Sequence, residues 1–115
     1  MVLEIVRGQG VWKDVLMDGE KAVGVSLIWA ERDAVIIRKF DFTFFGDYEK
    51  KGYDLEFYRM YEKDCRRDGI KKMLVVDVIQ NSKGEKFWKR CGFRPTEKGT
   101  MDGYLTLEKI LDAKD

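Results

Sequence analysis

Apolar and polar residues alternate along the first third of the chain. Short runs rich in β-branched and aromatic residues occupy residues 2–6, 12–17 and 22–30. An Asp18-Gly19 pair, a frequent hairpin turn, separates the second run from the third. The period of two predicts strands with one face against a core, and the short connections predict a meander. Residues 11–16 fit a short amphipathic helix equally well, because a pattern over so few positions cannot separate the two structures.

The period of two continues through residues 34–45. Phe40, Phe42 and Phe44 share one face of this segment, and charged or polar residues between them occupy the other face. This arrangement is typical of a half-buried strand. We therefore predict a further strand before the middle of the chain.

After this strand the pattern changes to helical spacing. Apolar residues recur every three or four positions through residues 53–67, and Asp68-Gly69 supplies a helix stop with glycine in the position that favours a left-handed backbone. A second helix is predicted over residues 83–90, closed by a Cys-Gly pair.

Strand patterns occur between and after the two helices. Residues 73–79 form an apolar run of the type that is buried on both faces of a sheet, interrupted by Asp77. Two further strand candidates, residues 93–97 and 104–107, flank a glycine-containing turn at residues 98–103. The order predicts an α+β fold, with a mixed, largely antiparallel sheet and two helices, in one domain over residues 1–115.

The amino-acid composition excludes several classes of function. With 22 Lys and Arg against 21 Asp and Glu, the net charge of +1 does not favour a nucleic-acid partner. No apolar run approaches the roughly 20 residues that cross a bilayer, and the first residues lack a signal-peptide pattern, so we expect a cytoplasmic protein without a membrane partner. The absence of histidine excludes catalytic triads and His-ligated zinc, and we expect no metal site. Charged residues at 37% are typical of thermophile proteins.

A motif at the second predicted helix points to a known family. The run from Asn81 to Phe93 reads N-S-K-G-E-K-F-W-K-R-C-G-F, and it resembles the N-x-x-A-x-x-[LF]-Y-x-x-x-G-F signature of the GNAT superfamily of N-acetyltransferases. The preceding hairpin, loop, helix and strand are similar to that family's order of elements, with Gly24 in its V-G position. The resemblance covers residues 12–108 and implies the GNAT fold, with the family's N-terminal helices reduced or absent.

The resemblance also implies an acetyl-CoA site. In the family, a strand end exposes main-chain groups to the pantetheine, and a loop directs amides at the pyrophosphate over a helix N-terminus. The matching residues are Phe44, Phe45, Lys50, Lys51, Gly52, Tyr53, Asn81, Gly84 and Phe87. The family's [RQ]-x-x-G-x-[GA] loop aligns with residues 49–54, so the carboxylates of Glu49 and Asp54 flank the expected pyrophosphate. Lys50 and Lys51 offset part of this charge.

Catalysis in the family requires a base for the attacking amine and an acid for the leaving thiolate. Asp41, on the strand before the loop, is the first candidate base. Asp77 is the second, because a carboxylate inside an apolar strand should have a raised pKa or a partner. Trp88 replaces the family's tyrosine acid, and its indole is no acid at neutral pH. Substitutes for that acid are Tyr58, Tyr61 and Tyr104. The simpler interpretation of each is a half-buried ring with its hydroxyl at the surface.

The cysteines and the basic second helix have simpler interpretations. Cys65 and Cys91 fall on the interior sides of the helices, where cysteine acts as a small apolar residue. The basic residues of the second helix either contact a 3′-phosphate of the cofactor, as the resemblance implies, or are only solvated. These residues are Lys83, Lys86, Lys89 and Arg90.

Two functions of different classes follow. The first is an acetyl-CoA-dependent N-acetyltransferase acting on a small-molecule or peptide amine. The second is a degenerate protein of the same fold that binds coenzyme A or a protein partner without turnover, which Glu49, Asp54 and Trp88 favour. An unrelated interaction module would require a coincidence over the whole motif. Residues 7–10 leave little room for the two helices that the family inserts there, so one side of the sheet stays uncovered and we expect self-association, such as a homodimer.

Overall fold

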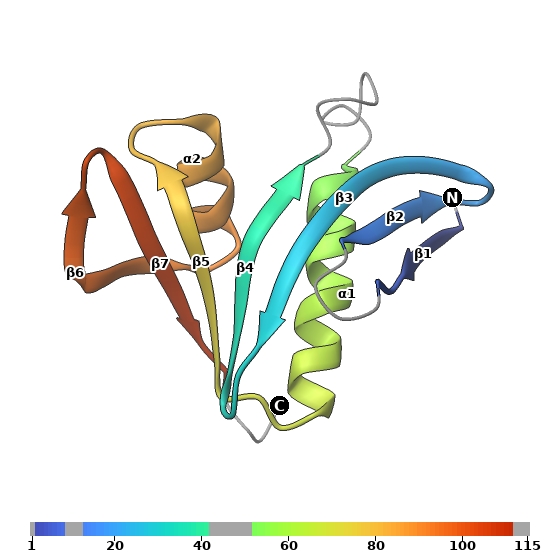
Figure 1. The fold of residues 1–115 in the computed structure, drawn as a ribbon, viewed down its shortest axis with the longest axis horizontal. Coiled ribbons are helices and arrows are strands. Elements are labelled where there is room, and N and C mark those ends of the chain that lie inside the picture. Colours follow the sequence, from blue (N-terminus) through green and yellow to red (C-terminus); the bar gives the residue numbers. More distant parts are fainter. Residues whose placement is uncertain (1, 9–12, 42–51, 112–115) are drawn as a thin grey trace. The chain divides into compact units, whose positions relative to one another are not determined.

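The computed structural model describes residues 2–8, 13–41 and 52–111 (Figure 1). Its strands are β1 (Leu3–Val6), β2 (Asp14–Asp18), β3 (Lys21–Ala30), β4 (Ala34–Asp41), β5 (Lys72–Ile79), β6 (Arg94–Met101) and β7 (Tyr104–Ile110). Its helices are α1 (Tyr53–Arg67) and α2 (Lys83–Arg90). The strands form a seven-stranded, mostly antiparallel sheet in the order β1-β2-β3-β4-β5-β7-β6, in which β4 and β5 run parallel. The predicted α+β class is confirmed.

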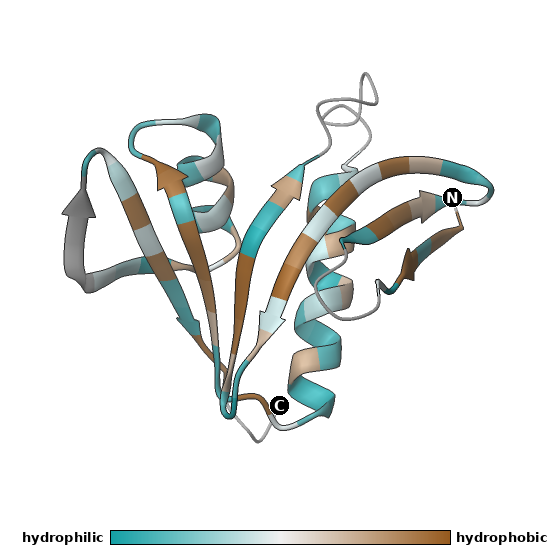
Figure 2. Cartoon of the chain, viewed as in Figure 1, coloured by the Kyte–Doolittle hydropathy of each residue, from teal (hydrophilic) through white to brown (hydrophobic). Residues whose placement is uncertain are grey.

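The chain divides into two compact units. The first comprises Met1–Ile28 with Lys39–Asp64, and the second comprises Trp29–Arg38 with Cys65–Asp115. Figure 2 shows hydrophobic stretches along β3, β4 and β5, and an alternation of hydrophobic and hydrophilic positions along α1. Each unit contains a set of buried apolar side chains of its own.

In the first unit, α1 packs against the face of the sheet that carries Leu16. The register pairs Asp14 with Ser26 and Leu16 with Gly24, so these four residues share one face of β2 and β3. The hydroxyl of Tyr61, from α1, contacts both Asp14 and Ser26, which places the helix over this face. The hairpin between β2 and β3 turns at Gly19, whose φ of +61° suits the first central position of a type II′ turn.

In the second unit, β5 lies between β4 and β7. One face of these strands carries the buried side chains of Ile37, Met73, Val75, Val78, Leu105 and Leu107. Helix α2 packs beside β5 and contributes Trp88, with Cys91 and Phe93 following it into the same interior. The register of β5 against β7 shifts between Val75 and Val78, and this bulge contains Asp77 with a positive φ.

Both helices end with glycine in the left-handed conformation. After α1, the amide of Gly69 donates to the carbonyl of Arg66 and the amide of Ile70 donates to that of Cys65. After α2, Gly92 and Phe93 make the equivalent bonds to Lys89 and Trp88. This Schellman arrangement is what a glycine at the C′ position favours, and the predicted bounds of both helices are confirmed. Neither helix is long and apolar enough to cross a membrane.

Three details of the predicted elements change. Residues 14–18 are strand, so the alternative of a helix over residues 11–16 is wrong for its described part. The turn expected at residues 98–103 narrows to Asp102-Gly103, because β6 continues to Met101. Both turn residues have positive φ, as a type I′ hairpin requires. The aromatic residues expected beyond Asp41 in β4, Phe42 and Phe44, lie outside the described residues.

Candidate functional site

The expected pyrophosphate loop is described only at its end. Phe44, Phe45, Lys50 and Lys51 lie outside the described residues. Gly52 has a φ of +72°, and apart from its chain neighbours no heavy atom of the described residues lies within 4 Å of the position that a Cβ would occupy there. The described part of the chain therefore leaves room for another group beside this glycine, which is a property that a phosphate-binding loop needs.

The first turn of α1 combines a buried anchor with acidic side chains. Tyr53 is buried, and its hydroxyl donates a hydrogen bond to the carboxylate of Asp18 at the end of β2. This contact fixes the start of the helix against the sheet. Oδ1 of Asp54 accepts the amide of Leu55 at 2.8 Å, so the carboxylate already satisfies one amide of the first turn. Asp54 therefore occupies part of the positive end of the helix dipole.

The start of α2 is closed by a capping box. Oγ of Ser82 accepts the amide of Glu85 at 3.1 Å, and Oε1 of Glu85 accepts the amide of Asn81 at 2.8 Å. A hydrogen bond from Lys89 and then the one from the Asn81 amide lower the pKa of Glu85 below its usual value. Glu85 is therefore ionised at neutral pH and holds the loop before α2 in place.

The motif residues around this cap differ in exposure. Asn81 is exposed with a φ of +63°, and Gly84 is exposed on the first turn of α2. A Cβ at Gly84 would lie 3.4 Å from Oγ of Ser82, an ordinary van der Waals distance, so the position next to the cap also accepts the alanine of the family signature. Phe87 is half-buried, with its ring edge-on to Trp88 at 4.9 Å between centroids.

The candidate base Asp41 and Trp88, which stands at the position of the family's tyrosine acid, lie in different environments. Asp41 is half-buried and is the last residue of β4. Trp88 is 5% exposed, and its ring packs edge-on against the rings of Phe87 and Phe93. The ring centroids of Trp88 and Phe93 lie 5.3 Å apart. Trp88 is thus a packing residue of the second unit, in the position where the family signature has tyrosine.

Of the other acid and base candidates, Asp77, Tyr58 and Tyr61 lie in environments that differ from those expected, and Tyr104 does not. Asp77 is exposed at the bulge of β5, so the premise that a buried strand encloses its carboxylate is wrong. Tyr58 and Tyr61 are both buried rather than half-exposed, and the hydroxyl of Tyr58 donates to Glu62 at 2.6 Å. Tyr104 is 49% exposed, in agreement with the expectation for a surface aromatic residue.

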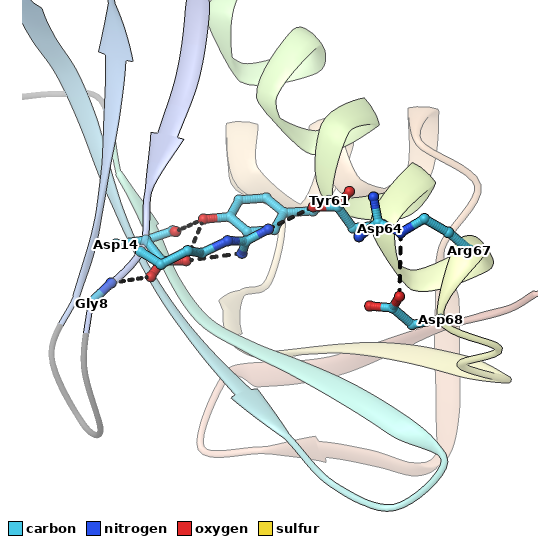
Figure 3. Close-up of polar contacts among 8 residues, drawn as sticks. Gly8, Asp14, Tyr61, Asp64, Arg67 and Asp68 are labelled. Carbon is cyan, nitrogen blue, oxygen red and sulfur yellow. Dashed lines mark hydrogen bonds and ion pairs between the residues drawn. The ribbon is translucent and has the colours of Figure 1, made fainter.

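A polar cluster in the first unit was not predicted from the sequence. Figure 3 shows the ring of Tyr61 reaching from α1 toward Asp14 on β2. The Tyr61 hydroxyl donates to Oδ2 of Asp14 at 2.8 Å and accepts the hydroxyl of Ser26. The guanidinium of Arg7 lies 5.1 Å from the Tyr61 ring centroid and donates to Asp14 at 3.3 Å and to Asp64 at 2.6 Å.

Every member of this cluster has a partner. The amide of Gly8 donates to Oδ1 of Asp14 at 2.9 Å, which uses the second oxygen of that carboxylate. Burial is the largest cause that raises the pKa of Tyr61 well above its usual value. The hydrogen bond to Asp14 raises this pKa further. The phenol therefore stays protonated at neutral pH. A protonated and fully paired phenol stabilises the fold rather than exchanging protons with a substrate.

We searched the described part of the chain for side chains grouped as metal ligands. Over residues 2–8, 13–41 and 52–111, no group of three or more Cys, Asp or Glu side chains is placed to hold a metal ion. Cys65 and Cys91 are buried thiols that are not joined in a disulfide, which agrees with their expected role as small apolar residues.

Solved structures of acetyltransferases share this fold. The PaiA N-acetyltransferase of Thermoplasma acidophilum, in complex with coenzyme A, matches 86% of the chain with a TM-score of 0.74 and 17% identity. A GNAT family acetyltransferase from Elizabethkingia anophelis with acetyl-CoA bound matches 86% with a TM-score of 0.70 and 11% identity. An acetyltransferase of Bacillus subtilis in complex with coenzyme A matches 86% with a TM-score of 0.67 and 14% identity.

The chain covers only part of each of these proteins. The chain spans 60% of the Thermoplasma protein, 75% of the Elizabethkingia protein and 76% of the Bacillus protein. No protein-family model and no curated protein sequence matches the chain. At these identities the likeness shows the fold alone.

Proposed function

We propose that this chain, which has the GNAT fold, binds acetyl-CoA and transfers its acetyl group to an amine. The observation that carries the proposal is the likeness over 86% of the chain to GNAT-type structures that hold coenzyme A or acetyl-CoA. The motif from Asn81 to Phe93 agrees with it, because the capped start of α2 lies where the family signature begins. The acceptor is a small-molecule or peptide amine.

The residues around Gly52 fit a pyrophosphate in part. The open backbone at Gly52 and the N-terminus of α1 provide the close approach and the positive potential that a phosphate needs. Lys50 and Lys51 would add charge. Asp54 opposes the anion, since its carboxylate already accepts the amide of Leu55. We therefore expect weaker binding than in a loop that ends in two glycines.

The pantetheine is assigned to the main chain of β5 and to the start of α2. The parallel register joins β4 to β5 from Ala34–Lys72 to Ile37–Val75, whereas β5 continues to Ile79. Backbone groups of β5 beyond Val75 are thus available to pantetheine amides on the β4 side. Asn81, Gly84 and Phe87 are assigned to the same cofactor.

In the proposed acetyl transfer, the main task of this chain is to position the thioester and the amine. When bound, acetyl-CoA supplies a thioester whose C–S bond breaks as the amine nitrogen forms an amide. Asp41 is assigned as the base that accepts the amine proton. Trp88 supplies no acid, and the thiolate takes its proton from solvent, which is tolerable because an alkyl thiol has a pKa of about 8.5. The missing acid should cost about 10²- to 10⁴-fold in rate.

The experiment is a thermal shift with coenzyme A on three proteins. Coenzyme A at 100 times its dissociation constant should add about 2.7 kcal/mol to the stability of the original chain. Gly52→Val should abolish this gain. Gly19→Val is the matched control, because Gly19 also has a positive φ and no described heavy atom, apart from its chain neighbours, within 4 Å of its Cβ position. It should lose similar intrinsic stability and keep the full response to coenzyme A. A response that survives Gly52→Val would place the cofactor elsewhere.

A second candidate is coenzyme A or partner binding without turnover. It is favoured by the burial of Trp88, which leaves the family's acid position without an ionisable group. Thiol release from acetyl-CoA with a panel of amines separates the two candidates. A thermal shift with no thiol release above the buffer rate supports the second candidate and removes the first.

A homodimer remains part of the proposal. Val6 pairs with Val15, and Val15 pairs with Val25, so these residues share the face of the first unit opposite to Leu16. Val6 is 47% exposed on this face. Burying such an apolar face against a second copy would stabilise both chains. Light scattering at tens of micromolar should give a mass above the monomer, and a strict monomer would remove the proposal.

A further inference from the structure

Asp18 connects three segments of the first unit. It is the last residue of β2, and its backbone pairs with Leu3 of β1 and with Lys21 of β3. Oδ1 of its half-buried side chain accepts the amide of Val2 at 3.1 Å, and Oδ2 accepts the hydroxyl of Tyr53. One carboxylate therefore binds both the beginning of β1 and the first residue of α1.

Tyr53 carries this connection to the expected pyrophosphate loop. Tyr53 is 4% exposed, and its ring lies beside that of Phe57, with the two centroids 6.4 Å apart. Its backbone directly follows Gly52, whose carbonyl accepts the amide of Glu56 at 3.1 Å and so begins the hydrogen-bonded turn of α1. The Tyr53 hydroxyl thus reaches the end of β2, while its backbone forms the first turn of the helix beside Gly52.

The direction of the first amides of α1 is important for binding an anion. The first amides of an α-helix have no carbonyl partner within the helix, and a hydrogen bond to a phosphate weakens steeply as its angle departs from linear. Asp54 and Glu56 add negative charge to the same turn. Because these carboxylates oppose the anion, we expect a pyrophosphate to be held only where the amides are well placed.

We propose that Asp18 is a positioning residue of the cofactor site. Through the hydroxyl of Tyr53, it fixes the first turn of α1 in the orientation that binds the pyrophosphate. The inference rests on the proposed function, which assigns the pyrophosphate to Gly52 and to the N-terminus of α1. Asp18 acts on the cofactor only through Tyr53, and its bond to Val2 holds the edge strand β1 at the same point.

A second tyrosine of α1 provides a matched control for this role. The hydroxyl of Tyr61 donates to Asp14 at 2.8 Å, at the opposite end of β2 from Asp18. Both contacts are tyrosine–aspartate hydrogen bonds between α1 and β2 within the first unit. Tyr61 lies about two helical turns from Tyr53, so the loss of its hydroxyl should lower stability without changing the amides at the helix start.

The test compares the affinities of Tyr53→Phe and Tyr61→Phe for coenzyme A and for pantetheine, which lacks the pyrophosphate. Titration of the backbone amide NMR signals measures them at a temperature where each protein is folded. Tyr53→Phe should weaken coenzyme A binding about three- to tenfold and leave pantetheine binding unchanged, since one hydrogen bond to a carboxylate is lost. Tyr61→Phe should change neither affinity. Equal losses for the two ligands in Tyr53→Phe, or equal coenzyme A affinities of the two variants, would overturn the proposal.

Two substitutions test Asp18 itself. Asp18→Asn keeps an acceptor for the Val2 amide, and its new amide group can donate to the Tyr53 oxygen, so it should retain most of the affinity for coenzyme A. Asp18→Ala loses both bonds and should match Tyr53→Phe, and the combination of these two changes should be no weaker than either alone. Additive losses in the combined variant would overturn the positioning role. So would a gain of affinity in Asp18→Asn, because it would show that the charge of Asp18 only repels the cofactor.

The outcomes separate this role from the proposed function. Coenzyme A binding that depends on Tyr53, without thiol release from acetyl-CoA, would keep the positioning role and refute acetyl transfer. If coenzyme A does not bind the original chain, the proposed function fails, and titration with inorganic pyrophosphate decides the positioning role. Weaker binding of pyrophosphate to Tyr53→Phe than to Tyr61→Phe would support the role, and equal binding or none would overturn it.

Discussion

Helix α1 places Tyr61 among polar groups, whereas helix α2 places Trp88 among aromatic rings. Both side chains are almost fully buried, at 3% and 5% exposure, and both helices end in the same glycine-terminated hydrogen-bond pattern. The Tyr61 hydroxyl connects Asp14 of β2 with Ser26 of β3. Trp88 instead contacts Phe87 and Phe93, its near neighbours along the chain.

This difference shows two ways to fix a helix on a sheet. Hydrogen bonds depend on direction, so the cluster around Tyr61 tolerates only one position of α1 against β2 and β3. Apolar packing is not directional, and its stabilising effect grows with the area removed from water. The first unit therefore gains a specific position of α1 from its polar cluster, whereas α2 is held in the second unit by the burial of Trp88 among aromatic rings.

The largest expected effect is the loss of Trp88. Trp88→Ala should lower the free energy of unfolding by about 3–5 kcal/mol, because it removes a buried ring and leaves a cavity between Phe87 and Phe93. Denaturation in urea measures this change. Phe87→Ala is the matched control, since Phe87 is half-buried on the same helix and should cost clearly less. Similar losses in the two variants would contradict the central role of Trp88.

Trp88→Tyr examines the same position chemically. The new hydroxyl would lie in an apolar interior, so we expect lower stability without faster acetyl transfer. Thiol release that rises together with intact folding would show that the position reaches the reacting atoms, and would refute its assignment as a packing residue.

The next effect concerns the Tyr61 hydroxyl. Tyr61→Phe should cost about 1–3 kcal/mol, because the Asp14 carboxylate loses a donor and the Ser26 hydroxyl loses its acceptor in a buried site. Tyr58→Phe is the matched control on the same helix. Its hydroxyl donates to Glu62, one turn away on the same helix, and its removal should cost less. A larger loss for Tyr58→Phe would show that the cluster does not hold α1.

The sequence predicted the two helices better than it predicted the contacts between elements. The apolar stripe and the glycine stops located α1 and α2 because these signals are local. Residues 11–16 were ambiguous, because their period could be read as helix or strand until the pairing of β2 with β3 fixed it. The turn before Tyr104 was placed too early, because the register shift that lets β6 continue past Pro95 has no local signal.

The candidate sites also differ in whether their residues are contiguous in the sequence. The motif from Asn81 to Phe93 is contiguous, so its helix and its cap could be recognised. The Tyr61 cluster joins residues 35 and 47 positions apart in sequence, and only the fold brings them together. Asp14 and Ser26, polar residues within β-prone runs, were the available signal. Asp77 was expected to be buried because its neighbours are apolar, and the bulge that exposes it depends on pairing with β7.

The polar cluster should also respond to alkaline pH. The pKa of Tyr61 is raised in the folded state, so the unfolded chain loses the tyrosine proton first as pH rises. The stabilisation is complete below pH of about 10, the ordinary pKa of tyrosine, and is lost progressively above it. Urea denaturation between pH 8 and pH 11, at about half-unit steps, should show this loss, and Tyr61→Phe should flatten the slope relative to Tyr58→Phe.

The smallest expected effect is at the capping box of α2, and it has the opposite pH dependence. The pKa of Glu85 is lowered, first by the hydrogen bond from Lys89 and then by that from the Asn81 amide. Its contribution is therefore present above its unfolded pKa of about 4.3, and it is lost as pH falls through the lower folded value. Glu85→Gln keeps an acceptor for the Asn81 amide but removes the charge, so it should flatten the acid limb of stability while leaving the alkaline limb unchanged. Glu56→Gln, at a half-buried glutamate in the first turn of α1, serves as the control. An equal change in the acid limb of both variants would show that the cap of α2 has no particular role.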